Sequence, residues 1–302
     1  MILITGGSGF LGQAIRNHLN ILQVPSLSLG QSSVNEIQCN LSNEIPKIQE
    51  VDMVIHSAGK AHKVPKTDEE KADFFKVNVQ GTENLLAGLE NKSSLKKFIF
   101  ISSVAVYGIT EGTEIDENSP LNPTDAYGKS KIEAEQIIQH WCKAQNIEYY
   151  ILRLPLIAGP NPPGNLGAMI KALRKGFYFS IGEADVKKSM VLANDVAELI
   201  PSLNGKAGIY NLTDGYHPTF DELEKGMAKA LNIKNPLKIP QMVATLIAKI
   251  GDILGSKSPI NSQKLKKIQS TLTFSDKKAR AELGWNPSPV LDNLDKIVTS
   301  KP

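Results

Sequence analysis

The glycine-rich stretch Thr5–Gly12 constrains the fold of this chain more than any other feature. It reads TGGSGFLG and continues the apolar run Ile2–Thr5, so it lies where a buried strand would turn into a helix. In that setting Gly6 allows a tight turn, Gly9 lets the backbone approach a ligand, and Gly12 allows close helix–sheet packing. The free N–H groups at the helix N-terminus would face an anion. We therefore expect a strand–turn–helix unit that binds the pyrophosphate of a dinucleotide.

The first half of the chain alternates strand-like and helix-like segments. Apolar, strand-like runs occur at residues 2–5, 24–29, 51–55, 98–101 and 147–154, and helical periodicity follows residue 11, spans 69–89 and resumes after Asp125. This alternation predicts an α/β fold with a doubly wound parallel sheet of the Rossmann type. Since the regularity ends at Pro155, we expect a dinucleotide-binding domain at 1–155. A strand near 207–213 would complete its sheet, and residues 156–302 would form a smaller, mostly helical substrate-binding lobe.

Composition excludes several classes of protein. With 41% hydrophobic and 22% charged residues, the 302-residue chain is neither disordered nor fibrous. A net charge of +3 gives no reason to expect a nucleic-acid partner, and the lysines at 264, 266 and 267 are typical of a solvated helix face. Cys39 and Cys142 have no metal-ligand spacing, so we expect packing roles in a reducing compartment and no metal site.

No segment has the properties of a membrane span. The opening MILITGG is already a strand entering a turn, so we expect no signal peptide. The apolar stretch 242–254, MVATLIAKIGDIL, is interrupted by Lys249 and Asp252 and is too short to cross a bilayer. We interpret it as an amphipathic core helix of a cytoplasmic protein; a peripheral membrane role is the alternative.

The glycine spacing is TG-x-x-G-x-x-G, and here the chain resembles the extended short-chain dehydrogenase/reductases of the NAD-dependent epimerase/dehydratase family. The resemblance covers nearly the whole chain. Its motifs are HSAG at 56–59, NVQGT at 78–82, FISSVAVYG at 100–108, YGKSK at 127–131, LRLPLIAGP at 152–160 and LGWNP at 283–287. Their order along the chain is that of the family.

The resemblance implies a catalytic group of Ser103, Tyr127 and Lys131. Tyr127 and Lys131 lie four positions apart, which places them on one helix face. Interconversion of C–OH and C=O needs a proton donor or acceptor beside the carbon that exchanges hydride with a nicotinamide. We expect the Lys131 ammonium to lower the pKa of Tyr127 and to reach the cofactor ribose. Ser103 would hydrogen-bond the substrate oxygen.

The resemblance also implies a set of residues around the dinucleotide. These expected cofactor contacts are Gly6, Gly9, Phe10, Leu11, Gly12, Ser32, Asn40, Leu41, Ala58, Lys60, Asn78, Tyr127, Lys131 and Leu154. Asn78 is expected to order the site, whereas His56 fits a structural histidine as well as a cofactor contact and is kept out of the catalytic set.

Many relatives act on nucleotide sugars, so the resemblance implies a UDP-sugar substrate bound by the second lobe. Its expected contacts are His62, Ser103, Val104, Asn165, Leu166 and Lys188. Asn165 and Leu166 match a motif that meets the diphosphate. Lys188 stands where most relatives have arginine and would offer a point charge without the bidentate fork; a surface lysine is its other interpretation.

Three classes of protein fit this fold: a dehydratase, a redox-inactive binding or sensor protein, and a C4 reductase or epimerase. A dehydratase needs an acid–base pair just after the catalytic serine, where this chain has Val104 and Ala105, so dehydration is disfavoured. A redox-inactive binding protein would be expected to lose part of the catalytic group, which is intact. Leu156 replaces a polar residue of the sugar epimerases, which points to a subgroup that resembles UDP-4-keto-6-deoxy-sugar reductases and 4-epimerases of surface-polysaccharide biosynthesis. We expect a 4-keto-6-deoxy-sugar 4-reductase, because the end of the second strand suits NADP(H). A UDP-hexose 4-epimerase is the alternative.

The residues at the end of the second strand indicate which cofactor the protein prefers. That strand is expected to end at Gly30, followed by Gln31, Ser32 and Ser33, without the acidic residue that binds the ribose of NAD. No arginine lies in the same stretch. We therefore expect a partial preference for NADP(H), with NAD(H) possible. Relatives often pair through two long helices, so a homodimer through 69–89 and 128–145 is also expected.

Overall fold

A computed structural model describes residues 1–61, 64–181, 185–254 and 261–299. At its centre is a seven-stranded sheet in the order β11-β7-β5-β4-β1-β2-β3. Its strands are β1 (Ile2–Thr5), β2 (Ser26–Gly30), β3 (Ile37–Gln38), β4 (Met53–His56), β5 (Lys97–Ser103), β7 (Glu148–Leu154) and β11 (Gly208–Asn211). Every pairing in this sheet is parallel. The strand order reverses between β1 and β4, which is where open α/β sheets form a ligand crevice.

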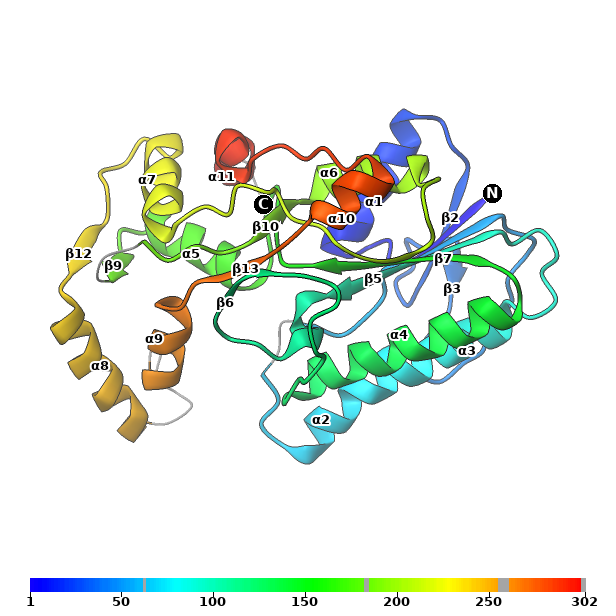
Figure 1. Ribbon diagram of the computed structural model, residues 1–302, viewed down its shortest axis with the longest axis horizontal. Helices are drawn as coiled ribbons and strands as arrows, with labels where there is room; N and C mark the ends of the chain where they lie inside the picture. The colour runs from blue at the N-terminus through cyan, green and yellow to red at the C-terminus, as the bar shows by residue number, and fades with distance from the viewer. Residues whose placement is uncertain (62–63, 182–184, 255–260, 300–302) are drawn as a thin grey trace.

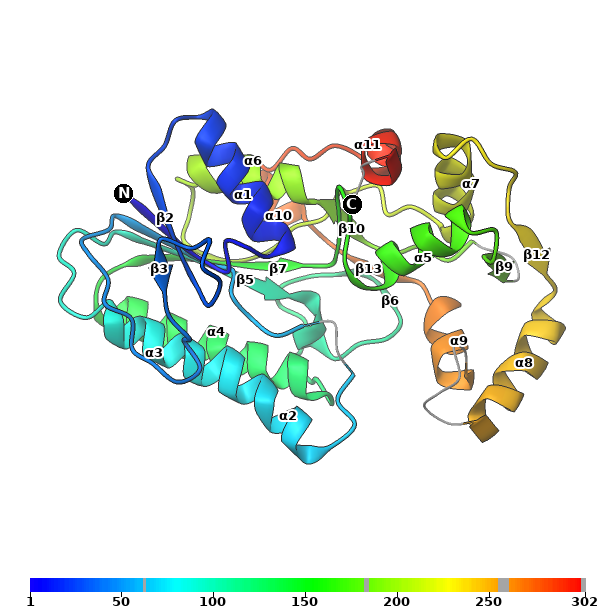
Figure 2. The same ribbon diagram turned by 180° about the vertical axis from the view of Figure 1, so that it is seen from behind.

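Helices cover both faces of the sheet (Figures 1 and 2). One face carries α1 (Phe10–Ile21), α6 (Ala193–Ser202) and α10 (Lys277–Leu283), whose apolar side chains pack with Trp285 into one core. The other face carries a continuous helical segment and the long helix α4 (Ala126–Ala144). The continuous segment consists of α2 (Asp68–Phe75), a π-helical turn (Lys76–Gln80) and α3 (Gly81–Gly88).

A second unit lies beyond the carboxyl ends of the strands (Figure 1). Its core is built by α5 (Gly164–Arg174), α7 (Phe220–Ala230) and α11 (Leu294–Thr299). Further out lie α8 (Gln241–Leu254) and α9 (Ser262–Ile268). Three parallel strand pairs connect these helices: β8 (Leu156–Ala158) with β10 (Met190–Leu192), β9 (Phe179–Ile181) with β12 (Leu237–Ile239), and β6 (Gly112–Ile115) with β13 (Leu272–Phe274). The described residues also include the short 3₁₀ helices Val104–Tyr107 and Val290–Asn293.

The predicted fold class is confirmed, including the late return of the chain to the sheet at β11. By their packing, α6, β11 and α10 join the nucleotide-binding unit although they follow Pro155, so the boundary at that residue stays a prediction. The short strand pairs escaped prediction because three or four residues carry no readable periodicity.

One burial prediction was wrong. The segment 242–254 is helical, as expected, but α8 is not a core helix, because its large apolar side chains are exposed. Only its small residues Ala244 and Ala248 belong to a buried cluster. Within the described residues, no helix has the length and apolarity that a bilayer span requires.

Candidate active site

The glycine turn after β1 has the geometry of a phosphate cradle. Gly6 has a φ of +71°, and a Cβ at this residue would lie 2.7 Å from the amide nitrogen of Ala58, so the turn excludes any side chain. A Cβ on Gly12 would lie 2.1 Å from the carbonyl oxygen of Gly6. Gly9 is the N-cap of α1, and a Cβ there would meet only the Gly6 oxygen, at 3.2 Å. The N-terminus of α1 is therefore open to a ligand, and its backbone amides suit a pyrophosphate.

The end of β2 differs from the expectation. Glu36 folds back along this strand and accepts a hydrogen bond of 2.7 Å from the backbone amide of Ser28. Arg16 of α1 pairs with the same carboxylate at 3.2 Å, and its Cδ would lie 2.9 Å from a Cβ on Gly7. The stretch 30–33 contains neither an acidic residue nor an arginine, but Glu36 and Arg16 reach this strand from other segments. Both groups come from segments that do not directly follow the strand, so counting along the sequence could not find them.

Ser103 and Tyr127 are brought together by the approach of α4 to β5. Ser103 is the last residue of β5, and Asp125 caps α4 by accepting from the Gly128 amide at 3.0 Å. A Cβ on Gly128 would lie 2.7 Å from the carbonyl oxygen of Ala105, so only glycine lets the helix start this close to the strand end. Burial raises the pKa of Tyr127, and a hydrogen bond with Ser103 opposes that increase. The expected lowering of the Tyr127 pKa is therefore not found, since burial outweighs the favourable contact.

Lys131 lies one turn further along α4 and is buried. Its ammonium donates to the carbonyl oxygen of Ile101 at 2.8 Å and lies 4.4 Å from the centre of the Phe100 ring. Burial lowers its pKa to about 8, while Glu135 opposes the change. A Cβ on Gly59 would lie 3.4 Å from the Lys131 Nζ, so this ammonium borders the loop after β4.

Asn78 connects that loop to α4 from within the π-helical turn. Its side-chain oxygen accepts from the Lys60 amide at 2.7 Å, and its side-chain nitrogen donates to the Ser130 hydroxyl at 2.9 Å. The Ser130 hydroxyl donates in turn to the carbonyl oxygen of Tyr127 at 2.8 Å. One side chain thus fixes the loop relative to the Tyr127 helix, and π-helical turns are frequent at functional sites. The Lys60 ammonium pairs with Asp73.

His56 has the contacts of a structural histidine. One ring nitrogen lies 2.6 Å from the hydroxyl oxygen of Thr5 and the other 3.0 Å from that of Thr82. Burial, helped by the nearby Lys131 charge, lowers its pKa to about 3. The ring is therefore neutral at physiological pH and ties β1 and β4 to α3.

A buried ion pair behind the catalytic helix was not predicted. Arg153 of β7 and Glu135 of α4 meet through two hydrogen bonds of 2.7 and 3.1 Å, with both side chains almost fully buried. Arg153 also donates to the Tyr107 hydroxyl at 3.1 Å, and that hydroxyl donates to Asn211 of β11 at 2.8 Å. Because the pair joins α4 to the sheet, it positions the helix that carries Tyr127. The sequence signal was an acidic residue on the same helix face as Lys131.

The structure places the other expected cofactor residues in the following positions, and their contacts with a dinucleotide stay predictions. Ser32 lies in the turn after β2, and Asn40 accepts a 3.1 Å hydrogen bond from Gln31 beside it. Leu41 is buried against Gly81 of α3. Leu154 is buried at the end of β7. Phe10 and Leu11 open α1, and the Phe10 ring would lie 3.1 Å from a Cβ on Gly159.

The residues expected to contact the substrate lie mostly in the second unit, and their contacts stay predictions. Asn165 and Leu166 occupy the first turn of α5, after Gly164 with a φ of +66°. Asn165 is exposed, whereas the Leu166 side chain is buried in the core of this unit and leaves only its backbone amide for a ligand. Val104 follows Ser103 in the 3₁₀ turn. His62 lies outside the described residues.

Lys188 lies beside α9. Its ammonium donates to the carbonyl oxygens of Lys267, at 3.0 Å, and Ser270. Burial lowers its pKa. A diphosphate contact by Lys188 stays a prediction, since these carbonyls already hold the ammonium in the structure.

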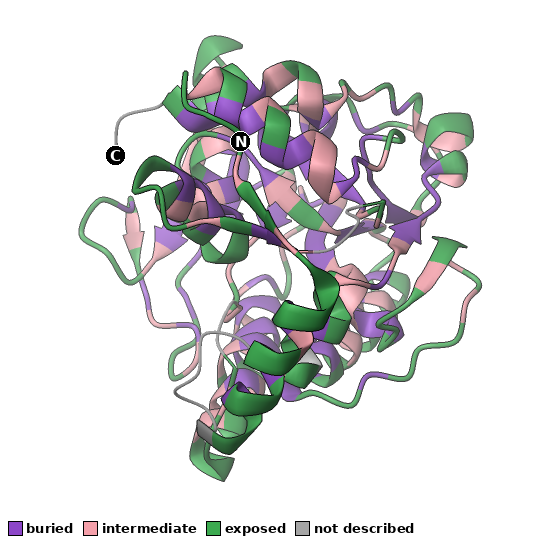
Figure 3. Cartoon of the chain, turned by 90° about the vertical axis from the view of Figure 1, so that its left-hand side faces the viewer, coloured by how far each residue is buried: buried purple, intermediate pink, exposed green. Residues whose placement is uncertain are grey.

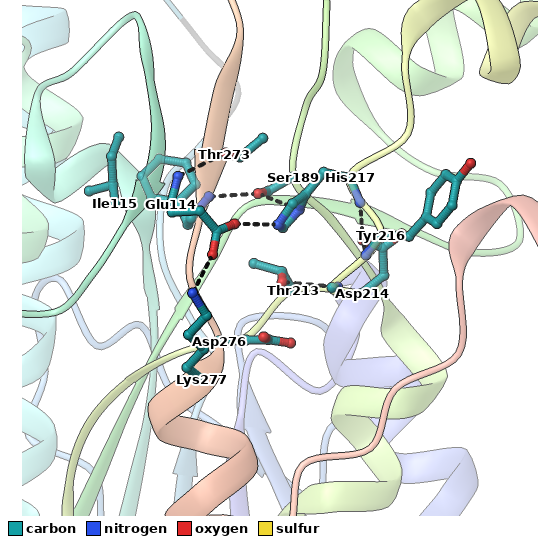
Figure 4. Close-up of polar contacts among 12 residues, drawn as sticks. Glu114, Ile115, Ser189, Thr213, Asp214, Tyr216, His217, Thr273, Asp276 and Lys277 are labelled. Carbon is teal, nitrogen blue, oxygen red and sulfur yellow. Dashed lines mark hydrogen bonds and ion pairs between the residues drawn. The ribbon is translucent and has the colours of Figure 1, made fainter.

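A polar cluster around Ser189, the residue after Lys188, holds this segment in place (Figure 4). The two ring nitrogens of His217 lie 3.0 Å from the Ser189 hydroxyl oxygen and 3.2 Å from the Glu114 carboxylate. Asp214 accepts from the His217 amide at 3.1 Å, which stabilises the left-handed backbone of His217 with its φ of +58°. Residues from three distant segments thus meet at His217. Sequence reasoning missed this cluster because no single motif contains its members.

The second unit also contains a small hollow next to the predicted substrate side. Its volume is about 100 Å³. Its lining is largely aromatic and aliphatic: Tyr178, Phe179, Ile181, Val186, Phe220, Glu224, Ile268 and Gln269.

With this geometry established, comparison with known proteins identifies the family. A model of the NAD dependent epimerase/dehydratase family matches residues 2–208. The chain belongs to this family. It is therefore an enzyme of a group that uses a nicotinamide dinucleotide, and the glycine cradle and the Ser103–Tyr127–Lys131 group fit that cofactor.

Its relatives act at C4 of sugars. An N-acetyl-alpha-D-glucosaminyl-diphospho-ditrans,octacis-undecaprenol 4-epimerase from Escherichia coli O157:H7 is 30% identical over 98% of this chain and 94% of the relative. A UDP-glucose 4-epimerase from Vibrio cholerae is 28% identical over 96% and 92% of the two chains. The fold is shared with the UDP-glucose 4-epimerase of Thermotoga maritima in complex with UDP-glucose, at a TM-score of 0.76 and 19% identity over 98% and 97% of the chains.

Proposed function

We propose that this chain is a C4 epimerase of a hexose or N-acetylhexosamine that is linked to a diphosphate. The observation that carries the proposal is the juxtaposition of Ser103 with Tyr127 beside the glycine cradle, together with 4-epimerase relatives that match almost the whole chain. Val104 and Ala105 offer no acid or base for removing water across C5 and C6, so the proposal excludes dehydration.

The dinucleotide, when bound, would supply hydride exchange at the sugar C4. Gly9 and the first turn of α1 would hold its pyrophosphate, and Lys131 its ribose. Tyr127 would take the proton of the C4 hydroxyl and return it to the same oxygen. Ser103 would hold that oxygen by a hydrogen bond, and Asn78 would keep the Tyr127 helix in register with the Lys60 loop.

The diphosphate of the substrate would meet the N-terminus of α5. Asn165 and Leu166 lie in the first turn of α5, where backbone amides have no intrahelical partners, and the N-cap Pro163 supplies no side-chain hydrogen bond, which suits an anion. This recognition is the same for a sugar linked to UDP and for a sugar linked to a polyprenyl diphosphate, because both carry the diphosphate next to the sugar.

A 4-keto-sugar reductase is the second candidate. It would use the same three catalytic residues and differ in releasing its reduced cofactor. One observation favours it: β2 ends at Gly30, without an acidic residue at that point, and Arg16 lies close by, which suits the 2′-phosphate of NADP(H). Glu36 opposes that preference, since its carboxylate pairs with Arg16.

The purified protein, without added cofactor, tests the proposal. We expect it to interconvert the C4 epimers of a diphosphate-linked N-acetylhexosamine, detected by nuclear magnetic resonance of the product. Tyr127→Phe should reduce turnover at least about 100-fold, since a positioned acid–base group contributes 10²–10⁴-fold, while dinucleotide binding is retained. If the Phe variant kept more than about a tenth of the turnover, Tyr127 would not have this role.

A further inference from the structure

Helix α8 presents its large apolar side chains to solvent. Met242, Leu246, Ile250 and Ile253 follow one another at helical spacing, with exposed fractions of 86%, 61%, 51% and 87%. Val243 and Ile247 widen this stripe. In a helix packed against a globular core, such residues form the buried face. Here the arrangement is inverted, and Figure 3 shows the exposed side of α8 on the outside of the molecule.

Small residues explain how α8 is attached in this orientation. Ala244 and Ala248 are buried and form a cluster with Leu265 of α9, against which Ile181 of β9 and Ile239 of β12 pack. The face with the two alanines therefore packs against the rest of the second unit. The large apolar side chains on the other face can contact another surface. An exposed contiguous apolar patch of this kind marks an interaction site.

The strands that lead to α8 add further exposed apolar side chains. Leu237 of β12 and Phe179 of β9 are register partners, with exposed fractions of 74% and 47%, and Phe177 is 76% exposed. Exposed apolar residues are therefore concentrated in this part of the second unit.

The charge around α8 is positive. In the described parts of 241–268 there are four lysines, at 249, 264, 266 and 267, and one acidic residue, Asp252. The carboxylate of Asp252 accepts from the Ser262 amide at 2.9 Å and is thus used within the α8–α9 pair. An apolar stripe combined with lysines is typical of helices that lie in the interface of an anionic lipid bilayer.

We propose that α8 docks the second unit onto the surface of an anionic lipid bilayer, lying parallel to it with its apolar stripe among the acyl chains. The helix has 14 residues, and at 1.5 Å per residue it is about 21 Å long, which is too short to span a hydrocarbon core of about 30 Å. A second copy of the chain fits this surface less well, because a symmetric contact through the stripe would bring Lys249 and its neighbours against like charges.

Docking would place the proposed site beside a membrane-embedded substrate. Ile181 packs against the cluster of Ala244, Ala248 and Leu265 and also lines the small hollow of the second unit. Resting on the proposed function, we infer that the sugar acted on is carried by a polyprenyl diphosphate, whose lipid remains in the bilayer while the sugar enters the crevice. The docking itself does not depend on that function.

Vesicle flotation of the full-length protein tests the docking. We expect the protein to float with vesicles of phosphatidylglycerol and phosphatidylethanolamine, and to float less with vesicles of phosphatidylcholine alone. Leu246→Gln/Ile250→Gln keeps helix-forming residues and should reduce the bound-to-free ratio at least about tenfold. Ile21→Gln/Ile45→Gln is the matched control, since these residues are 78% and 60% exposed elsewhere, and it should float like the unchanged protein.

Two results would contradict the proposed docking. One is that the wild-type protein does not float with anionic vesicles. The other is a Gln variant of α8 that floats normally; a change of oligomeric mass in that variant without any vesicle binding would indicate a second copy as the partner of α8.

Measuring turnover of two substrates by the α8 variant distinguishes a failure of the docking proposal from a failure of the proposed function. The α8 variant should convert a water-soluble UDP-sugar as before, but a polyprenyl-diphosphate sugar in vesicles at least about tenfold more slowly. Equal loss on both substrates would contradict the lipid-linked substrate. Flotation without turnover of either substrate would refute the epimerase and leave the docking intact.

Discussion

At the scale of single residues, Lys131 illustrates a conflict between function and stability. Its pKa is lowered to about 8 by burial, so below pH 8 the folded protein holds a desolvated ammonium, which destabilises it relative to the unfolded chain. Between pH 8 and the ordinary pKa of about 10.5, the folded state loses this proton first and the penalty disappears.

Lys131→Met should therefore stabilise the protein while abolishing turnover. At pH 7 we expect a gain in the free energy of unfolding of up to about 3 kcal/mol, which corresponds to the pKa shift of Lys131, and the gain should shrink towards pH 10. Urea unfolding at several pH values measures it. Lys129→Met, at an exposed position of the same helix, should change little. A Met variant that is less stable than the unchanged protein at pH 7 would contradict this account of the burial.

Glu36 is the residue on which we expect cofactor choice to depend. Its carboxylate pairs with Arg16 and would repel a 2′-phosphate. Glu36→Gln should therefore raise the affinity for NADP⁺ relative to NAD⁺ roughly three- to tenfold, the effect of removing one partly screened like charge. Calorimetric titration of both dinucleotides provides the ratio, with exposed Glu44→Gln as the control. An unchanged ratio would place the 2′ position of the ribose away from Glu36.

At the scale of elements, two glycines of the β1–α1 turn have different roles, one in dinucleotide binding and the other in folding. Gly9 has an ordinary φ of −76°, and a Cβ there would meet only the Gly6 oxygen, at 3.2 Å, so Gly9→Val should fold after a small adjustment but lose dinucleotide binding. Gly12→Ala would place a Cβ 2.1 Å from the Gly6 oxygen and should destabilise the protein by about 1–3 kcal/mol. Thermal unfolding and dinucleotide titration distinguish the two. If a folded Gly9→Val protein bound the dinucleotide normally, the prediction that this turn binds the pyrophosphate would be wrong.

The same elements show what a sequence can predict. The parallel sheet followed from apolar runs and glycine spacing, because each signal is local. The positions of Glu36, Glu135 and His217 did not, since their partners lie 8 to 103 residues away. For α8 the sequence correctly predicted a helix. Its periodicity shows where the apolar face lies on the helix but not whether the protein's own core or another surface covers that face. The alanines at 244 and 248 were the overlooked signal that this face points outward.

At the scale of the whole molecule, the carboxyl ends of the sheet face a second unit that holds the expected diphosphate contacts. The Ser189–His217–Glu114 cluster joins β6, the residue before β10 and the loop after β11. The homodimer expected through α2, α3 and α4 stays a prediction. This helical face and α8 lie in different parts of the molecule (Figure 1), so pairing and membrane docking are compatible.

The most direct measurement of the proposed reaction follows a label at the reacting carbon. The substrate is an N-acetylglucosamine with deuterium at C4, linked to UDP and, separately, to a polyprenyl diphosphate in anionic vesicles, and the protein receives no added cofactor. An epimerase returns the hydride to the carbon that gave it, so we predict a C4 epimer that retains deuterium at C4. A C4 epimer without deuterium would contradict the return of the hydride to the same carbon. Turnover only of a 4-keto sugar with added NADPH would contradict the epimerase and favour the reductase.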